Sequence, residues 1–254
     1  MRTPADARRP LHATPQALPG AFVLFVTLSL AGALPQTTAA QEPPDSRRPF
    51  AGGLNIVYGA PQGEFRDYVD RAWGLGANFV WTPMAFLGLR VDGGFMNYGH
   101  ETLRVPLSGT IGGRVLVDLT TDNNIAWIGV GPQVMAPRGA IRPYAHATAG
   151  LAYFATTSSV RGDDSSDTFA SDTNYDDAVF QWGVGGGVLV PVSRGRVPLS
   201  IDAGVRYHGN GRVTYVTEGG IEDNPDGSIT INAIESDGNV LSFHLGVGIG
   251  FGRR

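Results

Sequence analysis

Residues 241–251 have the sequence Leu-Ser-Phe-His-Leu-Gly-Val-Gly-Ile-Gly-Phe, and this stretch decides the fold. Every odd position, from Leu241 to Phe251, is apolar, whereas the even positions hold only serine, histidine and glycine. Successive side chains of a β-strand point to opposite faces, so this alternation gives a strand with one wholly apolar face. Lipid on one side and a packed polar interior on the other would account for both faces. We therefore interpret the stretch as one strand in the wall of a membrane-embedded barrel.

The same alternation recurs along the chain in hairpin-sized units. It covers residues 51–59, 73–81, 87–97, 143–155, 180–190 and 199–208, and a further segment that ends near Met135. With residues 241–251 this makes about eight strands, the number in the smallest common membrane barrels. The predicted fold is all-β, an eight-stranded antiparallel up-and-down transmembrane β-barrel. We expect its last strand to pair with the first one near Leu54 and Ile56.

The connections between these strands alternate in length. Short connections that contain proline are expected at residues 82–85, 136–142 and 191–197, and long polar ones at residues 60–72, 100–124, 158–177 and 209–238. Short periplasmic turns and longer outer loops are typical of bacterial outer-membrane barrels. Both ends of the barrel domain are therefore expected on the periplasmic side.

Residues 111–135 fit one regular strand less well. The aliphatic side chains of residues 111–119 fall on odd positions, whereas Ile128, Val130 and Val134 are even. One continuous strand would need a bulge near residues 120–124. We expect a long hairpin that rises above the membrane, with its tip near residues 108–113.

Aromatic residues gather where the predicted strands end, as in the two girdles of an embedded barrel. The set expected toward the outer interface is Tyr58, Trp73, Phe95, Tyr153, Phe180, Trp182, Tyr207 and Phe243, and the set expected toward the inner interface is Trp81, Phe86 and Phe251.

Residues 1–40 are predicted to be a signal peptide. Arg2, Arg8 and Arg9 precede an apolar run that ends at Pro35, and small residues follow up to Ala40, where we place cleavage. The run is about fourteen residues long, short of the roughly twenty that a spanning helix needs, so a retained anchor or a twin-arginine signal is the weaker alternative. Residues 41–49 would then be a short linker, and residues 50–254 the outer-membrane barrel.

Charge and composition exclude several classes of function. All 19 basic residues are arginine, and removal of residues 1–40 would leave 16 of them against 22 acidic side chains. An acidic exported chain without a basic stripe is not expected to bind nucleic acid. Cysteine is absent, which excludes disulfides, thiolate metal sites and cysteine nucleophiles.

Several short motifs resemble the small outer-membrane β-barrel family that includes the OmpA membrane domain, OmpX and OmpW. They are Pro61-Gln62-Gly63-Glu64-Phe65, Leu87-Gly88-Leu89-Arg90 and Arg142-Pro143-Tyr144. The resemblance implies residence in the cell outer membrane, with outer-membrane lipid, lipopolysaccharide and the assembly machinery as partners, and we expect a monomer. Such barrels usually finish on an aromatic residue, whereas here Gly252, Arg253 and Arg254 follow Phe251. Two alternatives remain open, an OmpW-like carrier of small apolar ligands and a soluble barrel of lipocalin type with its apolar face inward.

Charged residues of both signs are predicted to point into the barrel. This lumen polar cluster consists of Arg90, Asp92, His146, Asp202, Arg206 and His244. An eight-stranded barrel is just wide enough for side chains to fill, so we interpret the cluster as structural groups that satisfy one another rather than as a conduit. An open diffusion pore is not expected.

Asp202, Ser242 and His244 hold the ingredients of a nucleophilic triad, and some small outer-membrane barrels modify lipid A. Ser242 and His244 would lie about 7 Å apart along one strand, too far for a direct hydrogen bond, and would face away from the lipid. The chain is therefore predicted to have no enzymatic activity, no catalytic residues and no cofactor.

Two predicted outer loops are acidic. One holds Asp163, Asp164, Asp167, Asp172, Asp176 and Asp177, and the other holds Glu218, Glu222, Asp223, Asp226, Glu235 and Asp237. A calcium-loop template aligned on Gly227 places Ala233 where the bidentate glutamate is required, so no metal site is predicted. Weak divalent binding remains a hypothesis. We predict a structural or surface-interaction role carried by these acidic extracellular loops.

Overall fold

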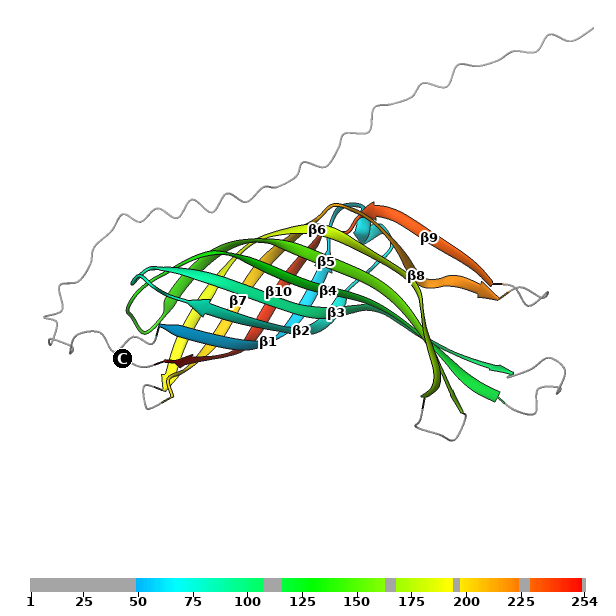
Figure 1. Cartoon of the computed structure of the whole chain (residues 1–254), viewed down its shortest axis with the longest axis horizontal. Coiled ribbons are helices and arrows are strands. Elements are labelled where there is room, and N and C mark those ends of the chain that lie inside the picture. The colour runs from blue at the N-terminus through cyan, green and yellow to red at the C-terminus, as the bar shows by residue number, and fades with distance from the viewer. Residues whose placement is uncertain (1–48, 107–115, 163–167, 194–196, 224–228, 253–254) are drawn as a thin grey trace, which may run out of the picture. The chain divides into compact units, whose positions relative to one another are not determined.

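The computed structural model describes residues 49–106, 116–162, 168–193, 197–223 and 229–252. Eight strands form a closed antiparallel barrel, with the order β1-β10-β7-β6-β5-β4-β3-β2 around the wall (Figure 1). They are β1 (Phe50–Pro61), β2 (Ala72–Trp81), β3 (Leu87–Pro106), β4 (Leu116–Met135), β5 (Arg142–Gly162), β6 (Thr168–Ser193), β7 (Leu199–Asn210) and β10 (Val240–Phe251). The predicted fold class is confirmed.

Pairing between the first and the last strand closes the barrel. The register places Leu54 opposite Val247 and Ile56 opposite Leu245, as the sequence predicts. Closure leaves the barrel wall without an unpaired edge, and in lipid only a closed sheet or a helix satisfies its backbone groups internally. Within the described ranges, helices fall short of the length and apolar character needed to cross a membrane.

The outer surface of the barrel wall is apolar. Phe243, Leu245 and Val247 are 47%, 60% and 50% exposed. The same face of the other strands exposes Leu54, Ile56, Leu75, Val91, Ile128, Val130, Leu151, Val184 and Ile201. We call this set the apolar belt. Because these side chains point outward, the lipocalin-type alternative with an apolar interior is wrong.

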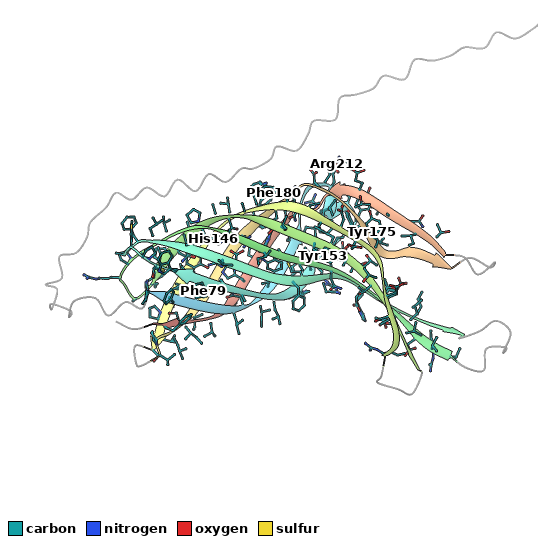
Figure 2. All side chains as sticks on the ribbon, in the orientation of Figure 1. Phe79, His146, Tyr153, Tyr175, Phe180 and Arg212 are labelled. Carbon is teal, nitrogen blue, oxygen red and sulfur yellow. The ribbon has the colours of Figure 1, made fainter. Side chains whose placement is uncertain are left out.

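Aromatic side chains flank the apolar belt at both ends. At one end Tyr58 packs on Trp73 and Phe243, with ring centroids 4.7 and 6.4 Å apart. At the other end, where the short turns lie, Phe79 packs on Phe251 at 5.9 Å. Figure 2 shows Phe79 and Phe180 on the outside of the wall and His146 among the strands. The two predicted aromatic groups thus lie at opposite ends of the wall.

Four strands continue beyond the barrel and form a sheet extension. β2 pairs with β3 only as far as Asn97, and β7 pairs with β6 only from Gln181 onward. Past these residues the ladder continues through β3, β4, β5 and β6, which project together from one end of the barrel (Figure 1). The prediction of loops over residues 100–124 and 158–177 is therefore wrong for most of their length.

The extension is rich in polar residues that favour strands. Thr102 and Thr120 join their hydroxyl groups across β3 and β4 at 3.2 Å, and Thr121 and Ser158 do the same across β4 and β5 at 3.1 Å. β-Branched threonine fits a pleated sheet, and cross-strand hydroxyl pairs stabilise it. Aliphatic residues such as Leu103, Val117 and Leu119 lie among these polar residues, so the long regular apolar alternation that marks the barrel strands is interrupted here.

The expected irregularity lies in β3 rather than in β4. The register shifts between Asn97 and Gly99, so Tyr98 is the extra residue, and β4 runs without a bulge through residues 120–124. The odd aliphatic positions of β4 continue the face that points into the barrel, and Val117 is buried. The predicted long hairpin is confirmed, whereas its tip near residues 108–113 lies outside the described residues.

The last predicted loop contains a second sheet. β8 (Arg212–Asp223) and β9 (Ile229–Asp237) form an antiparallel hairpin at the extension end of the barrel (Figure 1). A short 3-10 helix, η1 (Gly63–Asp67), follows β1 and lies against β9. Both elements fall within residues predicted to be loops, and both contribute to the closure of this end.

If the apolar belt faces lipid, the loss of stability caused by a charged substitution should depend strongly on its depth in the membrane. Val247 lies midway between Phe243 and Phe251 on β10, so Val247→Arg places a guanidinium near the middle of the belt. We expect a loss of about 2–4 kcal/mol in the free energy of unfolding. Equilibrium urea unfolding in phospholipid vesicles, followed by tryptophan fluorescence, measures it.

Ser171→Arg is the matched control, since Ser171 is exposed on β6 in the extension. Its effect should stay within about 0.5 kcal/mol. Equal losses for the two variants would contradict the placement of lipid around the belt.

Candidate functional site: the barrel lumen and its closure

The lumen polar cluster lies inside the barrel on four strands. β3 carries Arg90 and Asp92, β5 carries His146, β7 carries Asp202 and Arg206, and β10 carries His244. Asp92, His146 and Asp202 are no more than 4% exposed, and the His244 side chain is 8% exposed. Each position is one of the inward positions of the period-two pattern.

Asp92 is the centre of the first group of contacts. Arg90 donates from Nε to Asp92 Oδ2 at 2.8 Å, and Arg206 donates from Nη1 to Asp92 Oδ1. Arg90 also donates to Gln133 Oε1 at 3.0 Å, and Arg206 to Thr148 Oγ1 at 2.9 Å. One buried carboxylate therefore accepts from two guanidinium groups. We call these five residues the Asp92 group.

Asp202 belongs to a second group, with Tyr144 and His244. The Tyr144 hydroxyl donates to Asp202 Oδ1 at 2.8 Å and lies 2.9 Å from His244 Nε2. His244 Nε2 is 3.6 Å from Asp202 Oδ1. Tyr144 links the acid to the histidine, and it was missing from the predicted cluster although it occupies an inward position on β5.

A third group joins Gln181, His208 and Ser242. His208 Nε2 lies 2.9 Å from Ser242 Oγ, and its Nδ1 lies 3.2 Å from the Gln181 amide. Ser242 therefore contacts His208 and not His244, so the triad considered in the sequence does not form. His208 and Ser242 are 1% and 2% exposed, which removes this serine from both lipid and bulk water.

Glycines supply the space for the long polar side chains. A Cβ atom on Gly183 would lie 2.6 Å from Arg206 Nε, and one on Gly204 would lie 2.7 Å from the His244 ring. Such distances are far inside van der Waals contact. The narrow lumen holds its charged groups because neighbouring strands present glycine to them, which accounts for many of the 36 glycines of the chain.

Aromatic residues close the lumen at the extension end. Phe65 of η1 is 0% exposed, and its ring packs edge-on against Tyr215 at 5.0 Å and Tyr98 at 5.6 Å. Phe154 lies 6.1 Å from Phe65. We call these four residues the aromatic cap. Burial raises the pKa of the Tyr215 hydroxyl, which lies 2.8 Å from Ser236 Oγ.

The cap was not predicted because two of its four residues, Phe65 and Tyr215, come from segments expected to form loops. Phe65 stands alone in a polar stretch, and Tyr215 lies in the long connection before β10. A buried aromatic in a loop has no periodic signal. The single hint was the size of these side chains in otherwise polar segments.

The interior offers little free volume. A cavity of about 30 Å³ lies among the three polar groups, whereas small-molecule sites usually measure roughly 300–1,000 Å³. In the part of the chain that the structure describes, histidine, aspartate and glutamate form no group of three or more suited to a metal ion. Asp163, Asp164, Asp167 and Asp226 lie outside that part, so weak divalent binding by the acidic loops stays a hypothesis.

A closed antiparallel barrel with an exposed apolar belt and a filled polar lumen defines a transmembrane β-barrel. No protein-family model matches the chain, and no curated protein matches its sequence. Solved structures with a similar fold include outer-membrane proteins. All similarities reported below are under 25% identity and concern the fold.

OprG from Pseudomonas aeruginosa is 13% identical, with a TM-score of 0.46, over 82% of this chain and 97% of its own. Ail from Yersinia pestis is 12% identical, with a TM-score of 0.41, over 80% and 96% of the two chains. A major outer-membrane protein from Thermus thermophilus is 14% identical, with a TM-score of 0.42, over 79% and 99%.

The Asp92 group predicts a large effect of one substitution. Asp92→Ala leaves two buried guanidinium groups without their shared carboxylate, and loss of one partner of a buried pair costs about 3–5 kcal/mol. We expect this decrease in the free energy of unfolding in vesicles, measured by urea titration.

Asp122→Ala tests the same chemistry in water. Asp122 lies 2.7 Å from His100, and the two side chains are 35% and 60% exposed. Its loss should cost no more than about 1 kcal/mol. A loss for Asp92→Ala as small as this would show that the lumen contacts do not stabilise the barrel.

Proposed function

We propose that this protein is a non-enzymatic integral protein of the bacterial outer membrane, in which the barrel is the anchor and the extension presents a surface for interaction outside the cell. One observation carries the proposal. β3, β4, β5 and β6 continue as an ordered sheet beyond the apolar belt. The barrel closes within the belt and does not need these continuations. A protein that served only as an anchor would not need this extension.

Among the charged residues outside the belt, acidic ones outnumber basic ones. The described carboxylates of η1, the extension and the β8–β9 hairpin are Glu64, Asp67, Glu101, Asp118, Asp122, Asp172, Asp176, Asp177, Glu235 and Asp237. Part of this charge is paired within the protein, as between Arg212 and Glu235 at 2.9 Å. The excess of carboxylates favours a partner with basic groups.

The surroundings of the barrel in the membrane are part of the same proposal. The belt would contact outer-membrane lipid, and the first polar row above it, which includes Asn97 and Asn124, would meet lipopolysaccharide head groups. The assembly machinery would insert the chain into the membrane. The protein would be a monomer, and its lumen polar cluster would have a structural role. Neither the membrane anchor nor the surface role requires a group that moves or reacts inside the barrel.

A carrier of apolar ligands has less support. Met96 and Phe154, which point inward, are 1% exposed and pack within the cap region rather than around a free space. The lumen cavity is small, about 30 Å³, and charged or polar side chains line it together with Val57 and Trp127. The interior therefore favours the surface role over transport of apolar molecules.

Cell fractionation and site-directed labelling test location and orientation. We expect the chain to stay in washed membranes after salt extraction and to migrate faster on gels before boiling than after it. Since cysteine is absent, single cysteines report accessibility without background. Ser171→Cys in the extension should react with a membrane-impermeant maleimide on intact cells.

Met84→Cys is the control for the opposite end. Met84 is 56% exposed in the turn between β2 and β3. It should react only after the cells are lysed. Labelling of Met84→Cys alone on intact cells would invert the orientation, and release of the chain by salt would refute an integral barrel.

A variant with a shortened extension tests whether the barrel folds and stays stable without the proposed interaction surface. Residues 100–122 are replaced by Asn-Gly so that Gly99 and Asn123 close one hairpin, and residues 157–174 are replaced likewise between Thr156 and Tyr175. We expect a folded barrel whose free energy of unfolding changes by no more than about 2 kcal/mol, the scale of loop-closure entropy. Heat-modifiable mobility and urea titration measure it.

The full-length chain and Val247→Arg serve as references for an intact and a weakened barrel. If the shortened chain folds no better than Val247→Arg, the extension stabilises the barrel. The surface role would then lose the observation on which it rests.

A further inference from the structure

The three polar groups of the lumen surround one cavity. Its walls include Arg90, Asp92 and Arg206 from the Asp92 group, His244 from the second group, and His208 and Ser242 from the third group. Asn55 and His146 complete its polar lining. Hydrogen bonds join the members within each group, and the cavity lies where the groups meet.

His146 is the residue that the direct contacts leave unexplained. It is 4% exposed, and both of its ring nitrogens are without a hydrogen-bond partner in the structure. Its ring stacks on Tyr144 with centroids 6.0 Å apart, and Gly185 supplies the space beneath it. A neutral imidazole carries one donor and one acceptor, and burial of both unpaired is costly.

Two more unpartnered atoms belong to residues that line the cavity. Asn55 Oδ1 is a buried acceptor, and Arg206 Nε is a buried donor. Polar groups that are buried in native proteins are nearly always hydrogen-bonded to protein or to ordered water. The cavity therefore has both donors and acceptors unsatisfied at its border.

The presence of both unpaired donors and unpaired acceptors determines which kind of ligand fits the cavity. An anion would satisfy Arg206 but would repel Asp92 and leave Asn55 Oδ1 unpaired. A cation would face two guanidinium groups. A water molecule both donates and accepts, and the cavity volume of about 30 Å³ exceeds the roughly 10–15 Å³ that one water needs.

We propose that the lumen cavity binds an ordered water molecule, held by His146 and shared among the three polar groups. The water pairs with one of the two His146 ring nitrogens and links separate side-chain networks into one. The aromatic cap and Trp127, whose ring packs on His208 at 5.2 Å, separate the site from the extension end. Exchange with bulk water from that end is consequently restricted.

Magnetic resonance of the full-length protein, refolded in lipid nanodiscs and labelled with ¹⁵N and ¹³C, tests the proposal. We expect cross-peaks between the water resonance and the ring protons of His146, with opposite signs in laboratory-frame and rotating-frame experiments, as for a long-lived water. Ser242→Ala should retain these cross-peaks, which excludes relay through the serine hydroxyl.

His146→Phe removes the proposed partner, and the water cross-peaks to the Asn55 side-chain amide should then be lost. His100→Phe, at a histidine exposed on the extension, is the matched control and should retain them. Absence of long-lived water at His146 in the wild-type protein overturns the proposal, whether or not the variant folds. Anomalous scattering from bromide in the cavity of a soaked crystal would overturn it in favour of an anion site.

Discussion

Closure of the sheet between β1 and β10 is the constraint on which the rest of the structure depends. In lipid an unpaired strand edge has no water to satisfy it, so the wall must return to its first strand. Closure with eight strands fixes a narrow lumen, just wide enough for side chains. The alternation of residues 241–251 expresses both consequences, because the apolar face meets lipid and the small or polar face meets a crowded interior.

Crowding in turn determines the composition of the interior. Arg90, Asp92 and Arg206 can share one level of the barrel because facing positions, such as Gly183, lack a side chain. Charges of both signs are then close enough to pair, and the desolvation of each is offset by charge-assisted hydrogen bonds. The glycines of the lumen wall and the buried arginines therefore depend on each other, because the arginine side chains fit only where facing positions lack a side chain.

The barrel could be predicted from sequence because each of its strands separates lipid from lumen, and that difference imposes a period of two. The inward direction of Asp202 and His244 followed from the same period. Their partners did not, because register across strands decides that Asp202 meets Tyr144 and that Ser242 meets His208. The extension and the cap left no such signal. In the extension polar residues interrupt the apolar alternation, and Phe65 gains part of its burial from Tyr215, far away in the sequence.

The position of closure bears on where function can reside. The aromatic cap and the paired charges fill the lumen from the extension end inward, so a molecule that approaches this end meets the surface of the protein and not an entrance. The strands that continue past the belt are the longest in the described chain, and their outer parts are built from threonine, serine and charged residues that suit water. Ordering such a sheet costs conformational entropy that the barrel does not need. The cost is consistent with a surface maintained for contact, and the filled lumen beneath it gives that surface a rigid base.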